Sequence, residues 1–284
     1  MGLVVAISCR NGRFGRAGVS TFPLNQVLKH SLLSLGQDRF HPISKRGSQM
    51  SPQGLGWIII DSLDTMMIMN LTSQLSDARK WLCRKLTYDQ DQDVNTFETT
   101  IRMLGGLLSA HFLATQLPHL SSQRDYIYLN KSIDLADRLL GAYESNSGIP
   151  YASIHLRLGT GITSHADGGA SSTAEASTLQ LEMKYLAHLT GRKLYWRKAE
   201  EVIRVLDDND MEDGILPIFV HPDTGRFTSR EIRLGSRGDS YYGVSGSRFT
   251  GYTFEIIAYI WQSTSSSSIC RQGNPSILKC GHRL

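Results

Sequence analysis

The sequence predicts an all-α fold in which the helices are arranged in pairs. About six segments between residues 57 and 206 repeat apolar side chains at helical spacing. The alternating pattern of a β-strand is nearly absent over the same range. Loops rich in Gly, Ser and polar residues separate the segments. Helices without a sheet bury their apolar faces against one another, so we expect paired helices around a single core.

The chain before residue 57 offers little regular pattern. Residues 1–24 show neither a helical nor a strand period, and we expect them to be unstructured. A short helix is predicted over 25–35, and a polar loop with two prolines follows over 40–52.

The segment 57–71 is the most apolar run, and it predicts one buried helix. At 15 residues, it is shorter than the roughly 20 apolar residues that cross a bilayer. Asp61 and Asp64 lie one turn apart in it, and a buried carboxylate is costly unless it is paired. Either these acids make structural contacts, or the helix end opens into a polar site. The pattern favours neither reading.

An amphipathic helix is predicted over 76–86, and a longer helix over 95–115. In the longer helix Glu98 and Arg102 are one turn apart and can pair. Gly105 and Ser109 continue their face without bulk, so something is expected to pack or bind there. Spacing alone favours a structural explanation, in which an ion pair on the helix surface lies above a close helix crossing, rather than a binding site. One apolar face is predicted to contain Phe97, Ile101, Leu104 and Leu108.

Two further helices are predicted over 125–143 and 194–206. In the loop between 143 and 166, isolated His and Asp side chains are expected to be solvated rather than to bind metal. Between these helices, Ser-Ser-Thr173 predicts an N-cap and Gly191 a helix end. Glu175 is expected in the first turn, where it complements the helix dipole. Glu182 lies within the apolar stripe, which predicts a buried salt bridge.

Composition narrows the possible functions. The 284 residues carry a net charge of +4, and no Lys/Arg run marks a nucleic-acid surface, so no nucleic-acid partner is expected. The four cysteines form no CxxC pair, so neither a zinc site nor a disulfide framework follows. Asn70-Leu-Thr72 and Asn130-Lys-Ser132 match the glycosylation acceptor pattern, which arises often by chance and supports a secretory route only weakly.

Several motifs occur in one order and together resemble a known family. They include the segments 55–66, 94–110 and 174–182 and the run Gly238-Asp-Ser-Tyr-Tyr242. The chain from about 25 to 242 resembles the class I α-1,2-mannosidases, glycoside hydrolase family 47, of fungal type. The resemblance implies an (αα)₇ barrel and an inverting glycosidase with bound Ca²⁺. The implied substrate is α-1,2-linked mannose on high-mannose N-glycans of glycoproteins, in the secretory pathway.

The resemblance also assigns roles to residues. Glu98 matches the family's general acid, and Asp239 matches a second catalytic carboxylate. Asp61, Arg102 and Glu175 match polar residues that line the sugar site. An inverting glycosidase needs one carboxyl to protonate the leaving oxygen and another to activate water, about 6.5–9.5 Å apart.

The chain departs from the family after Tyr242. Gly243 stands where the family has the glutamate usually assigned as the base, and 243–284 shows no resemblance. We therefore expect an incomplete barrel, roughly its N-terminal half, with an unrelated tail that lacks the threonine ligand of Ca²⁺. Two functions stay open: an α-1,2-mannosidase, or an inactive remnant or glycan-binding pseudoenzyme. A half barrel predicts exposed apolar surface on 57–71.

Overall fold

The computed structural model describes residues 36–41, 43–44, 46–50, 53–165, 167–209, 211 and 214–242. The regions 1–24, 25–35 and 243–284, for which we predicted a disordered N-terminus, a helix and an unrelated tail, lie outside these ranges. The chain divides into two compact units, 1–87 and 88–284. Within the described ranges, every helix is too short or too polar to cross a bilayer.

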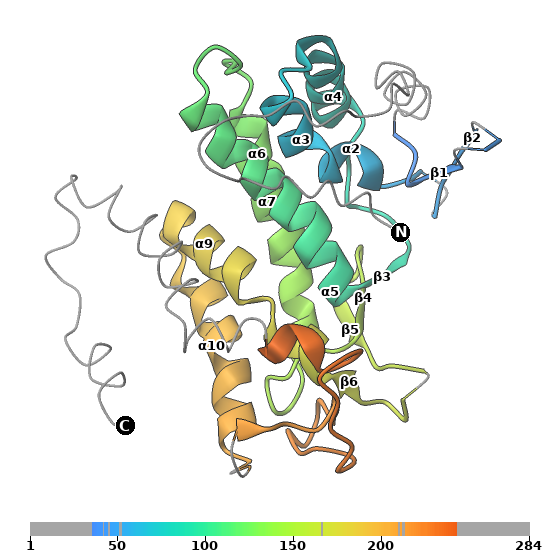
Figure 1. The fold of residues 1–284 in the computed structure, drawn as a ribbon, viewed down its shortest axis with the longest axis vertical. Helices are drawn as coiled ribbons and strands as arrows, with labels where there is room; N and C mark the ends of the chain where they lie inside the picture. The colour runs from blue at the N-terminus through green and yellow to red at the C-terminus, as the bar shows by residue number, and fades with distance from the viewer. Residues whose placement is uncertain are drawn as a thin grey trace, which may run out of the picture. The chain divides into compact units, whose positions relative to one another are not determined.

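In its described residues, the first unit combines a β-hairpin with the helices α2, α3 and α4 (Figure 1). Strands β1 and β2 pair antiparallel, and α3 packs on α4. The elements are β1 (Arg39–His41), β2 (Arg46–Ser48), α2 (Trp57–Asp61), α3 (Leu63–Ile68) and α4 (Thr72–Arg84).

The single helix predicted over 57–71 is wrong, because the chain breaks at Ser62 into α2 and α3. The Ser62 hydroxyl donates to the carbonyl of Ile58 at 2.5 Å, and this kind of back-bonding bends helices. One side of both helices is buried as expected. Ile68 and Met69 at the end of α3 are 61% and 41% exposed, so the segment is not apolar core throughout.

A buried carboxylate fixes the entry to α2. Asp38 is 5% exposed, and it accepts hydrogen bonds from the backbone N–H groups of Met50, Leu55 and Trp57. Gly56, at φ 68°, precedes the helix, and a Cβ there would lie 2.2 Å from the indole of Trp81 on α4. Glycine is therefore required both by the left-handed backbone and by the contact with α4.

In its described residues, the second unit contains further helices and two small sheets (Figure 1). Its helices are α5 (Thr96–Glu98), the π-helix η1 (Thr99–Leu104), α6 (Gly105–Gln116), α7 (Tyr126–Leu139), the 3-10 helix η2 (Leu140–Tyr143), α8 (Thr173–Ser177), α9 (Gln180–Thr190) and α10 (Lys193–Asp207). Its strands are β3 (Asp93–Asn95), β4 (Ser153–His155), β5 (Thr160–Ile162), β6 (Ser171–Ser172) and β7 (Phe219–Val220).

The helix predicted over 95–115 is observed as the continuous run α5, η1 and α6. Its apolar face differs from the prediction, because Phe97 and Ile101 are only half-buried while Met103 and Leu107 are fully buried. A π-helix bonds residue i to i+5, so a face laid out at 3.6 residues per turn does not continue through it. The π-turn begins directly after Glu98.

Paired helices form the core of the second unit, as predicted. The helix α6 packs on α7, and α9 packs on α10, which lies beside it in Figure 1. Met183 and Leu186 of α9 are buried, with Leu179 just before it. Gly191 ends α9 at φ 70°, which confirms the predicted helix end.

The strands are the part of the fold that the all-α prediction lacks. The strand β4 pairs with both β3 and β5, and β6 pairs with β7, all antiparallel. Each strand has two or three residues, too few to show the period-2 alternation by which strands are recognised. The β3–β4 pairing places 93–95, directly before α5, beside 153–155.

Candidate active site

Two of the predicted site acids occupy equivalent positions in capped helix starts. Asn95 precedes α5, and its Oδ1 accepts a hydrogen bond from the N–H of Glu98 at 2.7 Å. Ser172 precedes α8, and its Oγ accepts from the N–H of Glu175 at 3.3 Å. Each glutamate therefore stands third after its cap, the spacing of a capping box. The N-cap predicted at Ser-Ser-Thr173 is confirmed.

Glu98 pairs with Arg102, as the spacing predicts. The Nε of Arg102 donates to Oε2 of Glu98 at 2.6 Å. Both side chains are about two-fifths exposed, at 41% for Glu98 and 38% for Arg102. A pair this accessible contributes little to stability, at most about 1 kcal/mol. It leaves a carboxyl and a guanidinium group available to a ligand at the start of the long helix.

Glu175 makes contacts with two distant parts of the chain. Its Oε1 accepts from Nη1 of Arg237 at 3.2 Å, and its Oε2 accepts from Nδ2 of Asn95 at 3.5 Å. Arg237 also lies 3.8 Å from Oδ2 of Asp167. Glu175 does lie in the first turn of its helix, as predicted, but its carboxylate is held by these partners as well as by the dipole.

Asp239 follows Arg237 by two residues. It is exposed, and its Oδ1 accepts the N–H of Ser240 in the single helical turn 239–242. The carbonyl of Arg237 accepts from the N–H of Ala174, which ties this segment to α8. Three predicted site residues, Arg102, Glu98 and Glu175, thus lie along one series of contacts that passes through Asn95 and ends at Arg237. Asp239 is connected to this series only as a neighbour of Arg237 in the chain.

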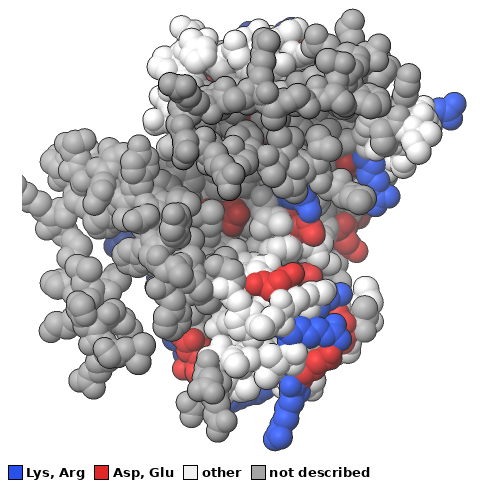
Figure 2. Space-filling view, in the orientation of Figure 1, with Lys and Arg blue, Asp and Glu red and all other residues white. Residues whose placement is uncertain are grey.

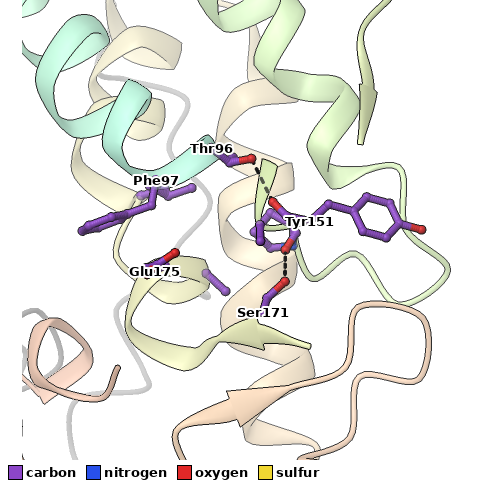
Figure 3. Close-up of a pocket in the computed structure, with 9 residues that line it drawn as sticks. Thr96, Phe97, Tyr151, Ser171 and Glu175 are labelled. Atoms are coloured by element: carbon purple, nitrogen blue, oxygen red, sulfur yellow. Dashed lines mark hydrogen bonds between the residues drawn. The ribbon is translucent and has the colours of Figure 1, made fainter. Parts of the chain in front are cut away.

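A shallow pocket lies beside Glu175 (Figure 3). The hydroxyl of Thr96 donates to the carbonyl of Tyr151 at 2.8 Å, and that of Ser171 donates to the carbonyl of Pro150 at 2.7 Å. Its free volume is about 10 Å³, which is room for one water molecule. A sugar ring is much larger, so this pocket can only border a sugar site. The lining residues are Thr96, Phe97, Pro150, Tyr151, Ala152, Ser171, Glu175, Ala176 and Leu179.

Glu182 lies in the first turn of α9 and is half-buried, with its Oε2 atom shielded from solvent. Burial raises the pKa of Glu182 to about 7. Its Oε2 has no hydrogen-bond partner among the described residues, and the predicted buried salt bridge is not seen among them. Its carboxylate instead packs over Gly105, where a Cβ would lie 3.6 Å from Oε1. The expectation that another group packs against the small residues of the long helix is confirmed at Gly105.

Asp61 belongs to the first unit and is exposed at the end of α2. Its exposure removes the cost of burial that the apolar sequence around it suggested. Asp64 is half-buried, and its Oδ1 accepts from the N–H of Thr65 at 2.6 Å.

The described residues do not fit a metal centre. No group of three or more His, Cys, Asp or Glu side chains among them is placed to hold an ion. The isolated groups of the 143–166 loop pair with neighbours: His155 contacts Asp91 at 2.9 Å, and Arg157 contacts Asp89 at 3.4 Å. We therefore assign no step to Ca²⁺.

Charge on the described surface is mixed. Figure 2 shows acidic and basic side chains next to one another on the visible face. Ion pairs among the described residues include Arg204 with Asp208 at 2.8 Å. Interspersed charge matches the scattered Lys and Arg of the sequence.

Sequence reasoning missed Asn95 and Arg237 as site residues. Asn95 had a local signal, since Asn followed three residues later by Glu is the capping-box spacing. Arg237 had none: its partner Glu175 lies 62 residues away in the chain, and only the fold joins them.

The comparisons decide the family. Residues 30–265 match the family described as Glycosyl hydrolase family 47, which is most of the chain. The chain belongs to glycosyl hydrolase family 47. The matched range extends past residue 242, where we predicted the family resemblance to end.

Curated family 47 relatives are similar over 73% of this chain. A mannosyl-oligosaccharide 1,2-alpha-mannosidase of Candida albicans is 56% identical over 207 residues, and an endoplasmic reticulum mannosyl-oligosaccharide 1,2-alpha-mannosidase of Saccharomyces cerevisiae is 48% identical over 224 residues. The matches cover 35% and 40% of those proteins, so the chain spans well under half of their length.

A solved family structure has the same fold over much of the chain. The alpha-1,2-mannosidase from Trichoderma reesei superposes with a TM-score of 0.68 at 25% identity. The match covers 77% of this chain and 47% of the solved one. The helix-rich architecture is therefore that of a family 47 mannosidase, and the closed (αα)₇ barrel remains a prediction.

Proposed function

We propose that the chain is the part of a mannosyl-oligosaccharide 1,2-α-mannosidase that carries Glu98, and that it hydrolyses α-1,2-linked mannose. The substrate class is a mannose-containing glycan, and high-mannose N-glycans of glycoproteins are the finer proposal. Relatives named as endoplasmic reticulum enzymes support a place in the secretory pathway. The mannosidase names of these relatives favour the enzyme over the inactive glycan-binding remnant.

The series of contacts that joins Glu98 to Glu175 and Arg237 carries the proposal. Three segments far apart in the chain, at 95–102, 172–175 and 237–239, meet through polar side chains. A structural role alone does not require two carboxylates and two guanidinium groups in one half-exposed region. Sugars are bound by hydrogen bonds to such groups, and glycosidic bonds are broken by paired carboxyls.

The proposed roles follow from the family resemblance, and the contact between Glu98 and Arg102 supports theirs. Glu98 protonates the leaving glycosidic oxygen, and Arg102 orients its carboxyl group by the 2.6 Å contact. Asp239 is the second carboxylate, and Asp61 and Glu175 bind sugar hydroxyls. Inversion requires water between the acid and the base. Calcium enters this proposal only through the family resemblance.

Replacement of Glu98 by glutamine tests the role of the acid. The amide keeps the shape of the side chain but has no proton to transfer, so kcat/KM for mannose release from an α-1,2-linked oligosaccharide should fall by roughly 100-fold or more. Released mannose from the purified 284-residue chain provides the measurement.

Glu201→Gln is the matched control. Glu201 is 39% exposed on α10 and pairs with Arg204 three residues on, so it resembles Glu98 in exposure and partner but lies on another helix. Its replacement should leave kcat/KM within about twofold. Equal activities for Glu98→Gln and the unmodified chain contradict the role assigned to Glu98.

A further inference from the structure

The two glycosylation acceptor sequences lie in opposite structural settings. Asn70 lies in the turn between α3 and α4, Thr72 is the first residue of α4, and both are exposed. Asn130 is exposed too, but it lies inside α7, and Ser132 is fully buried. Glycan transfer requires access to the asparagine and to the hydroxyl two residues later, since both define the acceptor pattern.

Asn70 lies just beyond the end of α3, where its backbone adopts a left-handed conformation. It has φ 56°, and its N–H donates to the carbonyl of Met67 at 3.1 Å. The N–H of Leu71 donates to the carbonyl of Met66 at 2.8 Å. These two bonds form a Schellman motif, in which Asn is one of the few residues other than Gly that suit the left-handed position. The acceptor side chain thus projects from a tight helix end.

Asn130, unlike Asn70, lies within a regular helix, which separates its amide from the hydroxyl of Ser132. On an α-helix, residues i and i+2 point about 200° apart, so the amide and the hydroxyl do not face the same side. The Oγ of Ser132 also donates to the carbonyl of Tyr128 at 2.8 Å. Recognition of this hydroxyl requires part of α7 to unfold.

We propose that Asn70 is an N-glycosylation site of the folded chain and that Asn130 is not. The donor class is an oligosaccharide linked to a lipid pyrophosphate. The amide nitrogen of Asn70 forms a bond to C1 of the first sugar, the bond from C1 to the pyrophosphate oxygen breaks, and the lipid pyrophosphate leaves while the amide loses one proton. In the cell this reaction depends on the secretory location proposed above.

Two exposed apolar side chains directly precede the site. Ile68 is 61% exposed and Met69 is 41% exposed. A glycan on Asn70 shields neighbouring surface because it is bulky and hydrophilic. The modification therefore shields the exposed apolar side chains at the end of the segment 57–71.

The test uses the purified 284-residue chain made in bacteria, a purified oligosaccharyltransferase and a lipid-linked oligosaccharide, with the modified sites assigned by mass spectrometry. Synthetic peptides that span each acceptor sequence serve as unfolded controls. We expect the folded chain to gain one glycan, at Asn70, and both peptides to be modified. Equal modification of Asn130 in the folded chain, or no modification at Asn70, overturns the proposal.

Three variants distinguish loss of the acceptor sequence from a change in the folded structure. Asn70→Gly removes the acceptor but suits φ 56°, and Thr72→Ala removes the hydroxyl without changing Asn70. Both should abolish modification, while Asn130→Gln should leave it unchanged. A glycan that persists in Thr72→Ala contradicts the assignment. Mannose release is not measured, so failure here leaves the hydrolase proposal intact.

Discussion

Glu182 carries a carboxyl group that the fold keeps from water. Its pKa rises from 4.5 to about 7 on burial. Below pH 4.5 the carboxyl group is mostly protonated in both the folded and the unfolded chain. As pH rises from there through 7, the unfolded chain releases its proton first, so the free energy of unfolding falls. Above pH 7 the free energy of unfolding falls no further, and its total decrease is about 3 kcal/mol.

Glu182→Gln should therefore gain stability relative to the unmodified chain as pH rises. Glutamine has no charge to bury, so the advantage should grow by about 2–3 kcal/mol between pH 5 and pH 8. Urea unfolding at both pH values measures it. The exposed and ion-paired Glu201 provides the control, because Glu201→Gln should show no such gain. A constant difference between Glu182→Gln and the unmodified chain contradicts the raised pKa.

Tyr143 is the titratable group that interacts with Glu182. Burial and the nearby charge of Glu182 raise the pKa of Tyr143 above its usual range, so this phenol stays neutral at all the pH values used. Its hydroxyl has no partner among the described side chains. Tyr143 therefore contributes nothing to the difference in stability expected between pH 5 and pH 8.

At the level of elements, Asn95 connects helix capping to the candidate site. It caps the long helix through Oδ1 and contacts Glu175 through Nδ2. Asn95→Ala should lower the free energy of unfolding by about 1 kcal/mol, the usual cost of losing a cap. Asn95→Asp keeps an oxygen for the cap, but it replaces the donor to Glu175 with a second carboxylate.

Asn95→Asp should therefore keep its stability within about 0.5 kcal/mol and lose roughly tenfold in kcat/KM. Denaturation curves and mannose release on the same preparations separate the two effects. If Asn95→Ala and Asn95→Asp behave alike in both measurements, Asn95 does not couple the cap to the site.

Local patterns predicted most helices but not their interruptions. The N-cap at Ser172, the end at Gly191 and the pairing of Glu98 with Arg102 depend on neighbours in the chain, and all three are observed. The break at Ser62 and the π-turn after Glu98 depend on hydrogen bonds that composition does not specify. Sequence reasoning therefore placed the elements better than it oriented their faces.

For the whole molecule, long-range contacts limited the prediction. Asp38 bonds to residues 12 to 19 positions away, and Arg237 reaches Glu175 across 62. No helical or strand period encodes such contacts. The ordered motifs identified the family, and the match over residues 30–265 confirms that identification. The catalytic roles of Glu98 and Asp239 remain predictions for experiment.

The stereochemistry of the first product tests the central proposal most directly. Proton NMR of an α-1,2-linked mannobiose, followed from the moment the purified chain is added, resolves the two anomers of released mannose before they equilibrate. Paired carboxyls acting through water predict β-mannose first. Release of α-mannose first contradicts the inverting mechanism, and no release by the folded chain contradicts the proposed activity.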